Sequence, residues 1–191
     1  RTVSRSINFT NVRKVKTNPQ AENHLYDIEN LSFNYSYRDR INRSFTIDEY
    51  VERQYTGGAA YNFSSKGSVL EPFKNSDGLT SPYYRWLKEI KFGLLPNNIL
   101  VRGDLNRYFE KKVYRNSEYS SDPNYRKYFL FDRKYGLKWD LTENLSLEYT
   151  ATANTVLDEP EGEGDEVQDE LKKNLKNFGR MKNFNQAVTA N

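Results

Sequence analysis

The chain has 191 residues, a single histidine, no cysteine and a formal net charge of +3. The absence of cysteine excludes a disulfide framework and a thiolate metal site. The small net charge, with both signs interspersed, does not favour a nucleic-acid partner. Hydrophobic residues make up 36% of the chain and aromatic residues 15%, and aromatic side chains favour strands and membrane interfaces. No stretch approaches 18 consecutive apolar residues, so the sequence predicts no transmembrane helix.

Alternation of apolar and polar residues predicts an all-β chain. A short strand with basic flanks is predicted within 1–16. Further strands are predicted at 31–38, 55–64, 99–113, 127–141 and 145–157, and a sixth begins within 184–191. Polar connections are predicted over 39–54 and 114–126. Residues 65–98 are irregular and contain strong turn signals, with one or two helical turns in the middle. An acidic loop over 158–180 contains a helix at 165–177, which Gly179 ends.

The stretch 129–149 predicts a β-hairpin in detail. With Thr142, Glu143 and Asn144 in the turn, a single register pairs apolar residues on one face and opposite charges on the other. The pairs on the apolar face are Leu141–Leu145, Trp139–Leu147 and Leu137–Tyr149. On the other face Lys138 stands opposite Glu148, a cross-strand pair worth roughly 0.2–1 kcal/mol.

Two architectures produce such alternation: a soluble sandwich and an outer-membrane barrel. The strands exceed the usual five or six residues of soluble strands, and a membrane-crossing strand needs about 9–11. Asp39, Arg107 and Arg133 interrupt the apolar face at similar distances from the opposite strand ends, which corresponds to a band roughly 20–23 Å tall. We therefore expect an antiparallel transmembrane β-barrel segment of about six long strands. Because the smallest such barrels have about 8 strands, the chain is expected to be part of a larger barrel wall.

This interpretation assigns a role to each strand face. Residues 65–98 become a periplasmic excursion and 158–180 an extracellular loop. The residues predicted to line the pore are Arg102, Asp104, Asn106, Asp132, Lys134, Lys138, Asp140 and Glu148. Those predicted to face lipid are Leu31, Phe33, Tyr35, Leu137, Trp139, Leu141, Leu145, Leu147 and Tyr149. Gly57 and Gly58 are predicted to mark a bend or a close approach by another segment or a partner.

No motif predicts catalysis or metal binding. His24 has no second histidine at metal-ligand spacing and no GxSxG nucleophile motif accompanies it. The acidic run 158–166 lacks the spacing of a calcium-binding loop and is interpreted as a solvated loop. We expect no enzyme activity, no metal and no cofactor.

An ordered set of motifs spans nearly the whole chain: INFTNVRKV, YDIENLSFNYSYRD, QYTGGAAYNF, EPFKN, LPNNI and WDLTENLSLEYTATANTVLDEPEG. In this order they resemble the giant outer-membrane translocons of the type IX secretion system, the SprA/Sov family. The resemblance implies a segment of a very large single-chain pore in the bacterial outer membrane. Such a pore passes folded cargo proteins, which carry a C-terminal signal, from the periplasm to the cell surface.

The resemblance also implies partners. These are the rest of the barrel chain, outer-membrane lipid, secreted cargo proteins, a shuttle barrel protein at a lateral gate and a periplasmic plug. Two alternatives stay open at this point. One is another outer-membrane barrel, such as a porin or an uptake transporter, and the other is a soluble β-rich adhesin or carbohydrate-binding module.

Overall fold

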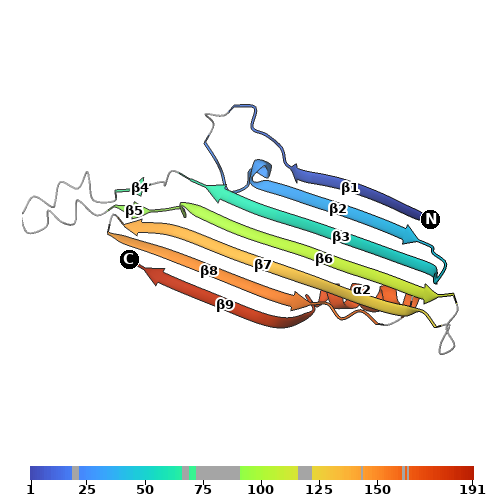
Figure 1. Cartoon of the computed structure of the whole chain (residues 1–191). Coiled ribbons are helices and arrows are strands. Elements are labelled where there is room, and N and C mark those ends of the chain that lie inside the picture. The colour runs from blue at the N-terminus through green and yellow to red at the C-terminus, as the bar shows by residue number, and fades with distance from the viewer. Residues whose placement is uncertain are drawn as a thin grey trace, which may run out of the picture.

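In the computed structural model, seven antiparallel strands form one open sheet (Figure 1). The structure describes residues 1–18, 22–65, 69–71, 91–115, 122–142, 144–160, 162 and 164–191. In sheet order the strands are β1 (Thr2–Val12), β2 (Leu31–Asn42), β3 (Ile47–Ser64), β6 (Asn98–Tyr114), β7 (Asn124–Thr142), β8 (Leu145–Val156) and β9 (Arg180–Ala190). The remaining elements are η1 (Ile28–Asn30), β4 (Val69–Leu70), β5 (Phe92–Gly93) and α2 (Asp165–Lys176). The predicted all-β antiparallel class is confirmed.

The predicted connection over 39–54 is wrong, because strands β2 and β3 continue through most of it. Only residues 43–46 form the turn. Charges alternate on both faces here, so the apolar periodicity that predicts a strand is lost. The register instead pairs opposite charges, with Asp39 opposite Arg53 and Arg40 opposite Glu52. Charge complementarity across the two strands adds to the apolar Ile41–Val51 pair in stabilising this pairing.

The other predicted elements lie close to the observed ones. The boundaries of β6, β7 and β8 agree with prediction to within three residues, and α2 ends one residue earlier than expected. Gly179 has φ +68, and its amide donates to the carbonyl of Asn174 at 3.0 Å, as expected for a left-handed residue that ends a helix.

The hairpin register is confirmed at three of its four predicted pairs: Leu137–Tyr149, Lys138–Glu148 and Trp139–Leu147. Strand β7 runs one residue further than predicted, and Thr142 rather than Leu141 stands opposite Leu145. Although Lys138 and Glu148 face each other, they form no ion pair in this described part of the sheet.

The connections divide between the two ends of the sheet. We call one the helix end, which carries the 43–46 turn, the connection after β6 and α2 (right in Figure 1). The other is the hairpin end, which carries 13–30, β4–β5 and the β7–β8 turn. Residues 43–46 at the helix end form a short turn, and the connection 13–30 at the hairpin end is long.

The helix ends of the strands are displaced across the sheet. The register places Thr2 of β1 level with Asn124 of β7, but Arg180 of β9 level with Leu130. The displacement falls between β7 and β9, and averaged over the whole sheet it is about one residue per strand. With about 3.3 Å per residue and 4.8 Å between strands, it corresponds to a strand tilt of roughly 35° in a closed sheet. Membrane barrels have tilts of about 35–45°.

The β4–β5 hairpin docks on the hairpin end of β7. The indole Nε1 of Trp139 donates to the carbonyl of Gly93 at 2.8 Å, and the amide of Asp140 donates to the side chain of Asn97 at 2.8 Å. A Cβ on Gly93 would overlap with the Asp140 carbonyl. Residues 66–68 and 72–90, which include the predicted helical turns, lie outside the described residues.

We predict that Gly93→Ala detaches the β4–β5 hairpin from β7, because the added methyl group cannot share space with a backbone carbonyl. The cost is about 1–3 kcal/mol of local stability. Trp139 fluorescence, measured in a Trp86→Phe background, should shift towards that of an exposed indole. Gly57→Ala is the matched control, since a Cβ there meets nothing within 4 Å. Equal spectra for the two variants would contradict the prediction.

Candidate functional surfaces of the sheet

All eight predicted pore-lining residues lie on one face of the sheet, which we call the polar face. Partners in an antiparallel register share a face. Arg102 stands opposite Lys134, Asp104 opposite Asp132, and Asn106 and Asp140 follow the same alternation. The prediction that these residues share a surface is confirmed, and their exposure to a pore stays a prediction.

Hydrogen bonds offset the like charges that face each other on the polar face. Directly opposed like charges are destabilising. The Arg102 guanidinium binds Asp104 through two contacts, Nε to Oδ2 at 2.6 Å and Nη2 to Oδ1 at 3.0 Å. Asn154 donates its Nδ2 to Asp132 at 2.6 Å. The central charges of this face are therefore engaged with their neighbours.

Gly58 provides the space for this arrangement. A Cβ on Gly58 would lie 2.8 Å from Oδ1 of Asp104. The predicted close approach is thus made at Gly58 by a side chain of the next strand, with no need for a partner. At Gly57 a Cβ would meet no described atom within 4 Å, so an approach there by another segment or a partner stays a prediction.

The opposite face is apolar and largely uncovered. By register it carries seven of the nine predicted lipid-facing residues, while Leu141 and Leu145 lie at the irregular end of the hairpin. Between the two ends of the sheet its apolar side chains are exposed, for example Phe9 at 55%, Phe33 at 50% and Val188 at 65%. We define the apolar band as the exposed side chains of this face: Ile7, Phe9, Phe33, Tyr35, Val101, Phe184 and Val188.

A row of charges bounds the apolar band on its helix-end side. Arg5, Asp39 and Arg53 stand in one register row across β1, β2 and β3. Arg107 on β6 lies two residues nearer the hairpin end than this row, opposite Tyr55. Measured from the hairpin ends of the strands, Asp39 lies 8 residues from Leu31, Arg107 lies 9 from Asn98 and Arg133 lies 9 from Thr142, so the predicted similar distances are confirmed.

The segment 157–179, which we call the strap, covers the apolar face at the helix end. Leu157 is 1% exposed, and the ring of Phe178 stacks on Phe131 with centroids 6.2 Å apart. The buried carboxylate of Glu159 accepts from Arg107, with Nε to Oε2 at 3.0 Å, and lies 4.0 Å from Lys127. The interpretation of the acidic run as a solvated loop is therefore wrong for Glu159.

The strap contacts were missed because Glu159 is one of several acidic residues and carries no distinguishing motif. A signal was present on the strands. Arg107 and Lys127 fall on the apolar parity of β6 and β7, and a cation on an apolar face requires an anion from elsewhere in the chain. Lys127 also donates to the carbonyls of Pro160 and Gly162, at 2.9 and 2.5 Å.

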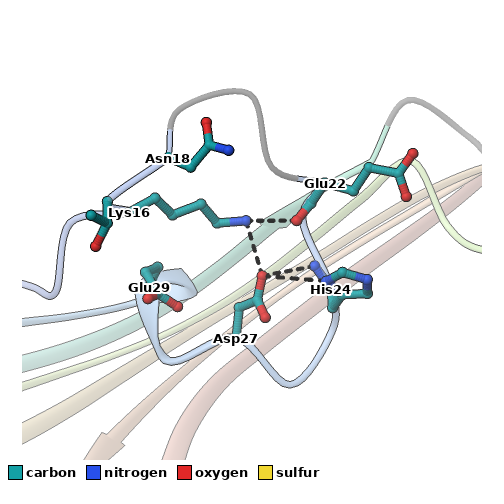
Figure 2. A pocket seen from close by; sticks show the side chains of 7 residues that line it. Lys16, Asn18, Glu22, His24, Asp27 and Glu29 are labelled. Carbon is teal, nitrogen blue, oxygen red and sulfur yellow. Dashed lines mark hydrogen bonds and ion pairs between the residues drawn. The ribbon is translucent and has the colours of Figure 1, made fainter.

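A pocket of about 280 Å³ lies in the connection between β1 and β2 (Figure 2). Lys16 donates to the carbonyl of Glu22 at 2.9 Å and pairs with Asp27 at 3.0 Å, and the backbone amide of His24 donates to Asp27 at 2.9 Å. Glu29 pairs with Lys14 at 2.9 Å. The charges around the pocket are thus used to fold the connection, which agrees with a structural role for His24.

Hydrogen bonds and ion pairs shift the pKa values of this connection. The backbone N–H of His24, and then Lys16, lower the pKa of Asp27. The hydrogen bond from Lys14 lowers the pKa of Glu29 and raises that of Lys14. Within the described residues no group of three or more His, Cys, Asp or Glu side chains is arranged to hold a metal ion.

No family model and no curated protein matches the chain. None of the helices among the described residues is long and apolar enough to span a bilayer.

We predict that Glu159→Gln destabilises the strap, because Arg107 and Lys127 lose the carboxylate between them. Removing one partner of a fully buried ion pair costs about 3–5 kcal/mol, and the partial exposure of Arg107 reduces this to about 2–3 kcal/mol. Hydrogen exchange at the Leu157 amide, which donates to Phe129, should report the loss.

The adjacent variant Asp158→Asn is the control for this experiment. Its partner Arg180 is exposed, so the change should cost at most about 1 kcal/mol. A strap equally protected in both variants would show that the Glu159 ion pairs do not hold it.

We also predict an acid-induced release of the 13–30 connection. The folded-state pKa values of Asp27 and Glu29 lie below the unfolded values of about 4, so their stabilisation is present above this pH. It is lost as the pH falls through the lowered folded-state values. Amide exchange at His24, corrected for intrinsic rates, should accelerate in this window, and Asp27→Asn should remove most of the pH dependence. Unchanged protection down to pH 2 would contradict this.

Proposed function

We propose that this chain is a segment of the wall of an outer-membrane β-barrel that conducts folded proteins, of the kind found in type IX secretion. The uncovered apolar band carries the proposal. A soluble sheet buries such a face in a core, whereas a barrel wall presents it to lipid. In the proposal the polar face lines a hydrated pore.

Three features of the sheet support a membrane-spanning wall. Strands β3, β6 and β7 have 18, 17 and 19 residues, more than the roughly 9–11 that cross a bilayer. The average strand offset across the sheet corresponds to the tilt of closed barrels. Charges border the apolar band at the helix end, where an arginine costs about 0–1 kcal/mol rather than about 2–4 kcal/mol at the bilayer midplane.

The ordered motif resemblance supports the more specific role in type IX secretion. The polar face suits this role because its mixed charges, many engaged with each other, present no single-sign ring of the kind that selects ions. Secreted cargo proteins, a shuttle barrel protein and a periplasmic plug belong to the same proposal. A porin or uptake transporter is the second outer-membrane candidate, and the size of the native polypeptide separates the two.

The decisive experiment determines where the native polypeptide carrying this sequence is found and how large it is. An antibody against 158–177 would be used on fractionated membranes. A band well above roughly 200 kDa in the outer membrane supports a segment of a giant translocon. A smaller outer-membrane band supports the porin or transporter. A soluble species overturns the membrane proposal.

A matched pair of substitutions on β2 tests which face meets lipid. Tyr35 belongs to the apolar band, and its neighbour Ser36 points to the polar face. Tyr35→Arg should cost about 2–4 kcal/mol if it lies near the bilayer midplane, and the amount of assembled protein in the outer membrane should fall. Ser36→Arg should assemble normally. The reverse order would show that the polar face meets lipid.

A further inference from the structure

Arg133 is an unusual charge on this molecule. It lies on β7 on the same face as the apolar band, between Gly103 of β6 and Ala153 of β8 in the register. It lies nine residues from the hairpin end of β7, as Arg107 does from the hairpin end of β6, so it stands at the charged border of the band.

The guanidinium of Arg133 has no anionic partner. Within the part of the chain that the structure describes, it forms no ion pair and no side-chain hydrogen bond, and its Nε is buried without an acceptor. The buried carboxylate of the strap, Glu159, is occupied by Arg107 and Lys127. By contrast, Arg102 on the polar face binds Asp104 through two contacts.

Two aromatic rings hold the guanidinium in place. Its central carbon lies 5.2 Å from the ring centroid of Phe131 and 5.5 Å from that of Phe178. Such cation–π contacts attract the charge, but they accept none of its five N–H donors. A buried Nε–H without an acceptor is costly, and the described residues supply no acceptor for it.

The surroundings of Arg133 define the chemistry of this acceptor. It must be anionic to pair with the guanidinium, and phosphate oxygens match the planar fork of arginine. It must also tolerate apolar neighbours, because Val101 of the next strand and Phe184 in the same register row are both exposed. A phosphate attached to acyl chains meets both conditions, whereas free phosphate meets only the first.

We propose that Arg133, together with Phe131 and Phe178, forms a binding site for the phosphate group of a membrane lipid, whose acyl chains lie along the apolar band. The strap places Phe178 over the guanidinium, so it contributes one side of the site. Together, the strap and the lipid would cover the apolar face of β7 at the place where the strap ends and the apolar band begins.

This inference rests on the proposed membrane location. The experiment below distinguishes a failure of the lipid site from a failure of the proposed function. The native polypeptide carrying this sequence would be purified in a neutral maltoside detergent. Native mass spectrometry would then measure the binding of phosphatidylglycerol, of phosphatidylcholine and of inorganic phosphate. Arg133→Gln would be compared with Arg126→Gln, which removes an arginine from the polar face of the same strand.

We expect the wild type to bind phosphatidylglycerol more tightly than phosphatidylcholine. In phosphatidylcholine the positively charged choline group competes with Arg133 for the phosphate of the same lipid. Arg133→Gln should weaken phosphatidylglycerol binding roughly tenfold, the loss expected for a hydrogen bond between charged groups. Arg126→Gln should leave it unchanged, and inorganic phosphate should compete weakly.

Equal weakening by the two variants would overturn the lipid site, as would inorganic phosphate binding as tightly as phosphatidylglycerol. If the Arg133→Gln variant fails to assemble, the comparison of the two lipids on the wild-type polypeptide tests the lipid site. Equal binding of the two lipids would then overturn the lipid site. A wild-type polypeptide that is soluble without detergent would overturn the proposed function instead.

Discussion

The structure depends on the pairing of backbone hydrogen bonds between adjacent antiparallel strands. Each ladder keeps side chains alternating between two faces, so one register decides the surroundings of every residue along a strand. The register from β2 to β8 keeps aromatic and aliphatic residues on one face and charged residues on the other. Both proposed surfaces, the polar wall and the apolar band, follow from this single constraint.

Exceptions to the alternation are as informative as the alternation itself. Arg107 and Lys127 fall on the apolar face, and the strap brings Glu159 over them. Arg133 also falls on that face, but there the strap supplies only an aromatic ring. The physical requirement is the same in both places, since a cation removed from water needs an anion. Within the described residues, Glu159 supplies this anion for Arg107 and Lys127. In the proposed lipid site, a lipid phosphate would supply it for Arg133.

The hairpin of β7 and β8 was predictable because both of its faces carried a signal over many residues, and only its last pair was misplaced. The connection 39–54 was not predictable from periodicity, because charges occupy both faces there. Matching opposite charges on the two sides of the turn, such as Asp39 with Arg53, would have predicted that both strands continue to residues 43–46. The docking of Gly93 on Asp140 could not be predicted, since it depends on backbone atoms that no side-chain pattern reports.

The sequence by itself determined the antiparallel class, the assignment of residues to the two faces and the helix that ends at Gly179. These properties depend on neighbours along the chain or on a single hairpin, where period and turn chemistry act locally. Only the tertiary structure decided the offset between strands, the aromatic surroundings of Arg133 and the burial of Glu159. These properties combine register shifts over several strands, or bring together residues more than fifty positions apart, such as Arg107 and Glu159. Local patterns carry no information about such distances.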